Sequence, residues 1–483
     1  MSEDPTSAAI DTPRILVAGI GRKVGTSTVI LGLLVNLKRA GISVAMAKVG
    51  PSLVDTTIHR RVAGRLSHTM DSWMLDKQQL QSATARLSAG AEMIIFEGNA
   101  GIYDKSEPGG SFETLAEFAR NLSTPIVLVV DAFGLRESIA AIVQGACQYG
   151  GAHVMGVIAN RVHNEAHNNC LRDAVERLGG PKYIAGIPIG DERLISGGTF
   201  GQAQGNPSLL TRNRLLEVGS LVNTYLDLDA LREVASHAGT FLVDKALTRG
   251  ENRRCRIAVA DDAAFHLTIQ DNLDLMRRAG AEIVAFSPLA DIKLPPKTGG
   301  IYIPGGYVHL YAKDLSANES MLGSIRNFAN AGGAIYTEGN SIAYMCREAV
   351  LYSGISYKML GLLPGVATSS VEETSVVDPV YSEVVTNQAT ILSRTGDVFR
   401  GLRDTRWLIR TDEKVLRCFQ VADRHAKSDG TASALMMKEG YSPLPHVLVT
   451  SMQAHWGSNA SLARMFVDSA SASDESAASS PEP

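Results

Sequence analysis

Residues 14–41 read RILVAGIGRKVGTSTVILGLLVNLKRAG, and this stretch decides the fold of the first half of the chain. An apolar run leads into a turn that contains Gly19, Gly21 and Gly25, and apolar residues then recur at helical spacing up to Gly41. That order predicts a strand, a loop and a helix. Further strand-like runs follow at intervals long enough for helices: VAMAKV (44–49), MIIFEG (93–98), PIVLVVDA (125–132) and VMGVIANRV (154–162). We therefore expect βαβ units and a parallel sheet.

A second series of strand-like runs begins after the basic stretch RGENRRCR (249–256). Its members are RIAVADD (256–262), AEIVAFSP (281–288), GIYIPGG (300–306) and AIYTEGN (334–340), again with helical patterns between them. The predicted fold class is α/β, with two doubly wound parallel-sheet domains.

The expected organisation has five parts. Residues 1–12 form a disordered N-terminus, 13–190 the first domain, 191–252 a helical connecting region, 253–468 the second domain and 469–483 a disordered tail. The tail, SASASDESAASSPEP, has no large apolar residue with which to offset its ordering entropy. The connecting region holds a Gly/Gln-rich segment and two helical patterns.

Composition excludes several classes of protein. The chain has 483 residues, 45% of them hydrophobic, and a net charge of -4, so no global basic field attracts nucleic acid. Five cysteines without a CxxC pair argue against a disulfide framework and a zinc site. The acidic N-terminus is unlike a signal peptide, and no apolar run approaches the roughly 20 residues of a membrane span. We expect a cytoplasmic protein.

The turn after the first strand has the outline of a phosphate-binding loop. Glycines let backbone N–H groups converge on phosphate at a helix N-terminus, and a hydroxyl after the last glycine can bind Mg²⁺. The lysine that should follow Gly25 is replaced by Thr26, and Lys23 lies three residues earlier. The alternative is a glycine-rich turn that serves only close packing of strand and helix. Candidate nucleotide-binding residues in the loop are Gly19, Gly25, Thr26, Ser27 and Thr28.

Several blocks in the first half carry a family resemblance: KVGPSLVDTTIH (48–59), MDSWML (70–75), EGNAGIYD (97–104) and GVIANRV (156–162). In this order they resemble the P-loop, dethiobiotin-synthetase-like nucleotide-binding domain of the cobyrinic acid a,c-diamide synthase family. The resemblance implies that Glu97 helps to hold Mg²⁺ and that Asn160 reads the nucleotide base. Without this context, Asn160 would be interpreted as a turn or capping residue.

The resemblance implies a Mg-ATP site with Ser27, Asp55 and Glu97 as metal-binding residues. Carboxylates near a triphosphate hold the metal that offsets phosphate charge. Taken alone, Asp55 would be a helix cap. Ser52 stands where the family has an aspartate and Thr26 where it has the loop lysine. Two charged positions around ATP are thus lost.

The second half resembles the family's class I, flavodoxin-like glutamine amidotransferase domain over residues 256–291, which include FSPLAD, and 301–321, which include GGY. In such domains a cysteine at a strand-to-helix elbow attacks the glutamine amide. The elbow corresponds to residues 337–341, and the nucleophile position is Gly339. The partner histidine corresponds to Gln453, although a register shift of two residues would place His455 there.

These losses leave two functional hypotheses. The first is a tetrapyrrole-binding or partner-binding paralogue without glutaminase activity and degenerate in ATP use. The second is an ATP-dependent amidoligase that acts on a tetrapyrrole carboxylate with free ammonia or a partner's glutaminase. The resemblance thus implies a tetrapyrrole-type ligand, an active homologue or glutaminase as a possible partner, and a possible homodimer. An unrelated partition-type ATPase would not carry the second domain.

Overall fold

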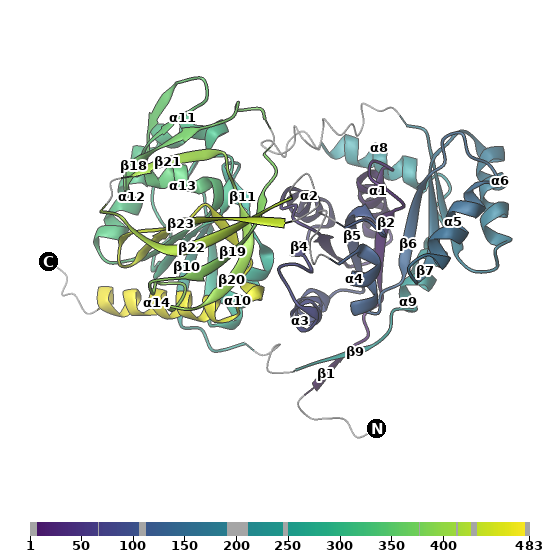
Figure 1. Cartoon of the computed structure of the whole chain (residues 1–483), viewed down its shortest axis with the longest axis horizontal. Helices are drawn as coiled ribbons and strands as arrows, with labels where there is room; N and C mark the ends of the chain where they lie inside the picture. Colours follow the sequence, from purple (N-terminus) through teal and green to yellow (C-terminus); the bar gives the residue numbers. More distant parts are fainter. Residues whose placement is uncertain are drawn as a thin grey trace. The chain divides into compact units, whose positions relative to one another are not determined.

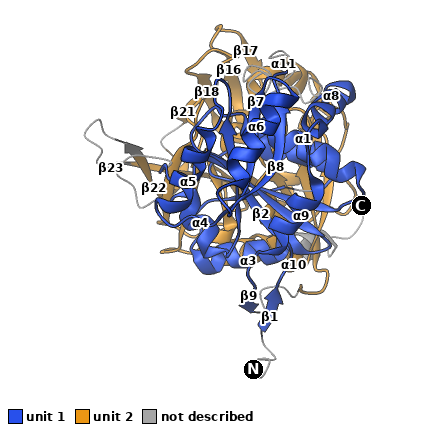
Figure 2. Ribbon diagram, turned by 90° about the vertical axis from the view of Figure 1, so that its right-hand side faces the viewer, with its two compact units in different colours: residues 1–248 blue, residues 249–483 orange. Residues whose placement is uncertain are grey.

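The computed structural model describes residues 7–65, 67–105, 113–190, 211–244, 250–375, 377–411, 414–426 and 432–478. The chain forms two compact units, residues 1–248 and 249–483, coloured separately in Figure 2. Among the described helices, none combines the length and the apolar character that a membrane crossing requires.

Unit 1 is built on a seven-stranded sheet in which all neighbouring strands are parallel. In spatial order, the strands are β4 (Ser67–Met70), β3 (Val44–Val49), β5 (Met93–Gly101), β2 (Arg14–Gly19), β6 (Ile126–Asp131), β7 (Val154–Val162) and β8 (Lys182–Pro188). The predicted parallel sheet is confirmed for the first half of the chain.

Helices cover both faces of this sheet (Figure 1). Ile95 of β5 packs in one core with α1, whereas the next residue, Phe96, makes an edge-to-face contact with Phe118 of α4. Because successive strand residues point to opposite faces, α1 and α4 lie on opposite sides. The helices are α1 (Thr26–Arg39), α2 (Val54–Ala63), α3 (Lys77–Ser88), α4 (Leu115–Asn121), α5 (Ile139–Gln148), α6 (Glu165–Glu176), α8 (Arg212–Asn223) and α9 (Leu228–Ser236).

The structure corrects two expectations in unit 1. The N-terminus is not disordered over residues 7–10, because β1 (Ser7–Ile10) pairs antiparallel with β9 (Phe241–Asp244). Composition could not reveal a pairing partner more than 200 residues away. In the region expected to connect the domains, α8 and α9 place Val222 and Leu231 in the core with α1, so both helices belong to unit 1. The Gly/Gln-rich segment lies outside the described residues.

Unit 2 contains a ten-stranded mixed sheet. Its first five strands are mutually parallel, and the remaining neighbours are antiparallel. In spatial order they are β12 (Ala281–Phe286), β10 (Cys255–Ala260), β13 (Gly300–Ile303), β15 (Ala334–Thr337), β24 (Val447–Val449), β23 (Ala432–Leu444), β22 (Leu416–Ala426), β19 (Val380–Thr386), β20 (Val398–Arg403) and β25 (Met452–Ala454). The predicted parallel sheet thus forms, with an antiparallel extension.

Both faces of the parallel half are covered. Ile301 and Ile335 belong to the core that includes residues of α11 (Val308–Ala317) and α12 (Glu319–Asn330), whereas Tyr302 and Tyr336 belong to the core on the other face. The second core includes residues of α10 (Gln270–Arg278) and α14 (Ser461–Ala478). Two smaller sheets complete the unit: β17 (Ser356–Lys358), β16 (Cys346–Val350), β18 (Leu363–Ser369) and β21 (Trp407–Thr411) in one, and β11 (Phe265–Leu267) with β14 (Gly305–Gly306) in the other.

The tail expected to be disordered from residue 469 is helical up to Ala478. Helix α14 begins at Ser461 and buries Leu462, Phe466 and Ala470 against the sheet. Ala470 extends this apolar face although its side chain is small. The expectation of a disordered tail was wrong here because it considered only large apolar residues. Residues 479–483 lie outside the described part of the chain.

Candidate functional site

The phosphate loop of unit 1 joins β2 to α1. Gly19 ends the strand, and Gly25 precedes the helix with a left-handed backbone of φ 89°. The helix begins with Thr26, Ser27 and Thr28, so its first N–H groups point into the loop. This is the strand, loop and helix order that phosphate binding requires.

Glu97, on β5 beside the loop, is the centre of a buried polar network. Its side chain is only 1% exposed, and its Oε1 atom accepts a hydrogen bond from the Ser27 hydroxyl at 2.9 Å. The same oxygen lies 3.0 Å from the Lys48 ammonium, while Oε2 lies 2.6 Å from Nε2 of His59. His59 Nδ1 in turn lies 3.1 Å from the Ser67 hydroxyl. Three elements, α1, β3 and α2, thus converge on one carboxylate, and β4 joins the network through His59.

Lys48 bridges the two predicted metal-binding carboxylates. Its ammonium lies 2.8 Å from Asp55 Oδ2, in addition to the contact with Glu97. Burial alone would lower the pKa of Lys48, but attraction to Glu97 and Asp55 outweighs it, and the pKa lies above its ordinary value. Burial would likewise raise the pKa of Glu97, but Lys48 and His59 hold it well below its ordinary value. Lys48 and Glu97 are therefore both charged at neutral pH.

The predicted metal-binding set is brought together. Ser27 and Asp55 both reach Glu97, the first directly and the second through Lys48. A hydroxyl and two carboxylates are oxygen ligands of the kind that Mg²⁺ prefers. Among the described residues, no group of three or more His, Cys, Asp or Glu side chains is placed to hold a metal ion, and the predicted set itself has only two carboxylates.

Asn160, at the end of β7, packs directly against the loop. Its Nδ2 group donates to the Val24 carbonyl at 2.9 Å. A Cβ atom at Gly25 would stand 2.2 Å from the same nitrogen, so both the backbone angle and the close approach require glycine there. The amide that was expected to read a base therefore also fixes the position of the loop.

Sequence reasoning did not select Lys48 and His59, which are 4% and 2% exposed. Both lie in the block at 48–59, and the lysine interrupts the apolar run VAMAKV. A charged residue in an otherwise buried strand is the signal that could have identified it, because lysine is almost never buried without a partner.

In unit 2, the elbow joins β15 to the short helix α13 (Ile342–Met345). Gly339 has a left-handed backbone of φ 63°, and the turn η3 (Gly339–Ser341) follows at once. Asn340 Nδ2 donates to the Gly306 carbonyl at 3.3 Å. The strand, sharp turn and helix expected of a nucleophile elbow are thus present, and the residue at the expected nucleophile position is a glycine.

The side chain of Gln453 occupies the space in front of this elbow. A Cβ atom at Gly339 would stand 2.8 Å from Cγ, 3.0 Å from Cδ and 3.1 Å from Nε2 of Gln453. The same nitrogen would stand 1.8 Å from a Cβ atom at Gly305, and it donates to the Leu267 carbonyl at 3.2 Å. The structure therefore places Gln453 against the elbow.

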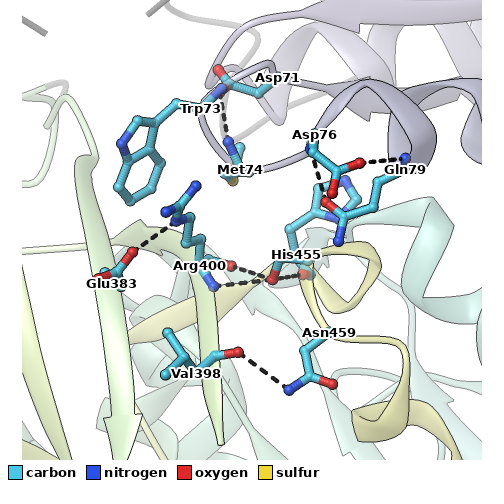
Figure 3. Close-up of polar contacts among 11 residues, drawn as sticks. Asp71, Trp73, Met74, Asp76, Gln79, Glu383, Val398, Arg400, His455 and Asn459 are labelled. Carbon is cyan, nitrogen blue, oxygen red and sulfur yellow. Dashed lines mark hydrogen bonds and ion pairs between the residues drawn. The ribbon is translucent and has the colours of Figure 1, made fainter. Parts of the chain in front are cut away.

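His455 has a different role. Its backbone N–H donates to the Arg400 carbonyl at 2.9 Å, and its Nδ1 accepts from the Gly457 N–H at 3.2 Å, which caps the turn η4 (Trp456–Ser458). Figure 3 shows His455 beside Arg400, whose guanidinium pairs with Glu383 at 2.8 Å. The His455 side chain is fully buried and stabilises this turn.

Glu338 precedes the elbow and is completely buried. Burial raises its pKa to about 8, although the hydroxyls of Tyr302 and Tyr336 donate to its two oxygens at 2.5 and 2.9 Å and oppose the shift. A carboxyl in this environment holds its proton near neutral pH far more tightly than an exposed one.

Comparisons with known proteins cover both units. Residues 15–195 match the CobQ/CobB/MinD/ParA nucleotide binding domain, and residues 256–393 match the CobB/CobQ-like glutamine amidotransferase domain. A protein of Leptospira interrogans named cobyrinate a,c-diamide synthase is 30% identical over 461 residues, which cover 95% of this chain and 99% of the relative. A protein of the same name from Methanothermobacter thermautotrophicus is 32% identical over 396 residues, covering 80% of this chain and 86% of the relative.

Proposed function

The chain belongs to the cobyrinate a,c-diamide synthase family, and from that premise we propose that it is a member without glutaminase activity of its own. It binds a tetrapyrrole-type ligand, or an active homologue, as a carrier or partner subunit. Its five cysteines have no disulfide, which is consistent with a reducing cytoplasm.

The observation that carries this proposal is the elbow. Glutamine hydrolysis in a thiol amidotransferase proceeds through attack of the sulfur on the amide carbon and a thioester intermediate. Gly339 supplies no sulfur, and the Gln453 side chain fills the place next to it. Cys346, the next cysteine along the chain, is fully buried on β16, and burial raises the pKa of its thiol to about 12. It supplies no thiolate at neutral pH.

A binding titration and a labelling experiment test the proposal. Binding of cobyrinic acid or sirohydrochlorin, followed by absorbance of the macrocycle, should saturate at one ligand per chain. Treatment with 6-diazo-5-oxo-L-norleucine, which alkylates glutaminase thiols, should leave the intact mass unchanged. A mass increase mapped to one cysteine, or the absence of binding by both macrocycles and by an active homologue, would contradict the proposal.

A second candidate function is an amidoligase that uses Mg-ATP and free ammonia. The buried polar network of Ser27, Lys48, Asp55 and Glu97 favours it, because a chain that had abandoned phosphate chemistry would have no need to bury the Lys48 and Glu97 charges. Ser27, Asp55 and Glu97 would hold Mg²⁺, which offsets phosphate charge when bound. Backbone N–H groups at the start of α1 would orient the phosphates, and Lys48 would supply positive charge beside them.

Calorimetry separates the two candidates. The ligase must bind Mg-ATP and release phosphate when cobyrinic acid and ammonium are both present, with glutamine unable to replace ammonium. A carrier binds the macrocycle and releases no phosphate. Absence of ATP binding would eliminate the ligase and leave the carrier.

A further inference from the structure

The place of Gln453 in β25 directs its side chain at the elbow of unit 2. Its neighbours on the strand, Met452 and Ala454, are buried in the core that includes residues of α10 and α14. Because successive strand residues point to opposite faces of a sheet, the side chain between them points away from this core. Pairing with β20 sets Gln453 opposite Leu402, so the register of the strand fixes this direction.

The carboxamide of Gln453 is tightly enclosed. The residue is 6% exposed, and its Nε2 group donates to the Leu267 carbonyl of β11. Its amide carbon, Cδ, would stand 2.8 Å from a Cβ atom at Gly305, on the neighbouring strand β14, and 3.0 Å from one at Gly339. Both positions are glycine, and the absence of a side chain at each makes the room that the carboxamide fills.

This carboxamide lies within reach of the place where a glutamine amide would be attacked. A sulfur at position 339 would lie one bond beyond the Cβ atom, and the carbon that it attacks would lie roughly 3–3.5 Å from the sulfur, or about 4 Å from the Cβ position. The amide carbon of Gln453 lies within this radius, and non-bonded carbon atoms stay about 3.5–4.0 Å apart. A glutamine molecule positioned at the elbow would therefore overlap with the Gln453 side chain.

We propose that Gln453 closes unit 2 to free glutamine by placing the chain's own carboxamide in the position of the glutamine amide. The inference rests on the assignment of the elbow in the proposed function, but it concerns binding rather than hydrolysis. A site that lacks only the sulfur could still bind glutamine, whereas a site that is filled by an internal side chain cannot. Gly339 and Gln453 thus act against two separate steps.

Truncation of the side chain should open the site to a small amide. Gln453→Ala removes a CH₂–CONH₂ group, and acetamide is the molecule that matches it. In the full chain, we expect this variant to melt at a lower temperature than the wild type and to recover part of the loss saturably as acetamide is added. Acetate has the same shape but carries a charge and no N–H donor for the Leu267 carbonyl, so it should have no such effect.

Two chains serve as controls for the acetamide titration. The wild type should show no saturable shift, because its site is filled. Gln420→Ala removes the same group from an exposed glutamine of the same unit, which leaves no cavity, and it should also show none. If Gln453→Ala does not fold without ligand, its refolding yield replaces the melting temperature. Recovery in acetamide but not in acetate supports the proposal, and equal yields overturn it.

Equilibrium dialysis with radiolabelled L-glutamine measures the closure directly. Gln453→Ala should bind glutamine at least about tenfold more tightly than the wild type. Equal binding by the two chains overturns the closure, and so does a variant that responds to neither acetamide nor glutamine. These outcomes leave the proposed loss of hydrolysis standing, because that proposal fails only if the wild type releases glutamate from glutamine.

Discussion

In each unit a glycine with left-handed backbone lies between a strand and the helix that follows it, Gly25 in unit 1 and Gly339 in unit 2, and an amide side chain packs against each. At Gly25 the amide is Asn160, and at Gly339 it is Gln453. The surroundings differ. Beside Gly25 lies a network of buried polar and charged side chains around Glu97, whereas Gly339, at the expected nucleophile position, has no side chain.

If unit 2 has no glutaminase activity, as proposed, the backbone of a site can persist after its chemistry is lost. A left-handed glycine and the turn around it are held by the packing of strand and helix, so they persist when the reactive side chain is replaced. A buried charge network has no such independent support, because each member is costly without its partners. Its presence around the loop of unit 1 therefore points to a charged ligand more strongly than the loop glycines do.

Removal of the centre of the network should have the largest effect. Glu97→Ala leaves the buried Lys48 ammonium with Asp55 alone, and we expect the free energy of unfolding of unit 1 to fall by about 3–5 kcal/mol in urea denaturation. Glu233→Ala breaks the half-exposed pair with Lys182 and should cost less than about 1 kcal/mol. Equal losses in the two variants would show that the network is no more than a set of surface pairs.

The carboxyl beside the elbow should make unit 2 sensitive to pH. The folded pKa of Glu338 is raised from 4.5 to about 8, so its contribution to stability is fully present below the unfolded pKa and is lost as pH rises through the folded value. Between pH 5 and pH 8 the free energy of unfolding should fall by a few kcal/mol, on the order of 3. Glu338→Gln should flatten this dependence, and an unchanged slope in the variant would assign it to other groups.

Restoring a side chain at the elbow should be unfavourable. Gly339→Ala forces a Cβ atom into left-handed backbone and against Gln453, and we expect a loss of about 1–3 kcal/mol. Truncation in Gln453→Ala removes the crowding, so the double variant should lose less than the sum of the single losses. Strict additivity in this cycle would mean that the Gln453 side chain does not fill the elbow in solution.

The amide beside the phosphate loop should have the smallest effect. Asn160→Ala removes the hydrogen bond to Val24, which is worth about 1 kcal/mol. Amide hydrogen exchange at Val24 and Gly25 should accelerate while the exchange of β6 stays as in the wild type. Unchanged exchange in the loop would show that Asn160 does not hold it.

Sequence reasoning reached most of the fold because strand and helix periodicities are local. It predicted both α/β units, but not the antiparallel extension of the second sheet, in which β22 pairs with β19 and β25 with β20 across intervening segments. Strand β1 was missed because its partner β9 lies more than 200 residues away, and α14 because small residues hid an apolar face.

Part of the candidate site could be predicted from the sequence. The motif blocks pointed to Glu97, Asp55 and Gly339, which are recognisable one residue at a time. Lys48 and His59 are recognised by their contacts with Glu97, Asp55 and Ser67, and the position of Gln453 depends on how β25 pairs with β20. Such contacts between distant segments require the structure.

The central claim is that unit 2 keeps the backbone of the elbow without glutamine hydrolysis, while unit 1 keeps its buried charged network. The most direct test is glutamate release from L-glutamine by the full chain, measured with Mg-ATP and cobyrinic acid present, and a cobyrinate a,c-diamide synthase as positive control. We expect no glutamate above the background without protein. Stoichiometric or faster release would contradict the account, because it would require a nucleophile that the described elbow does not contain.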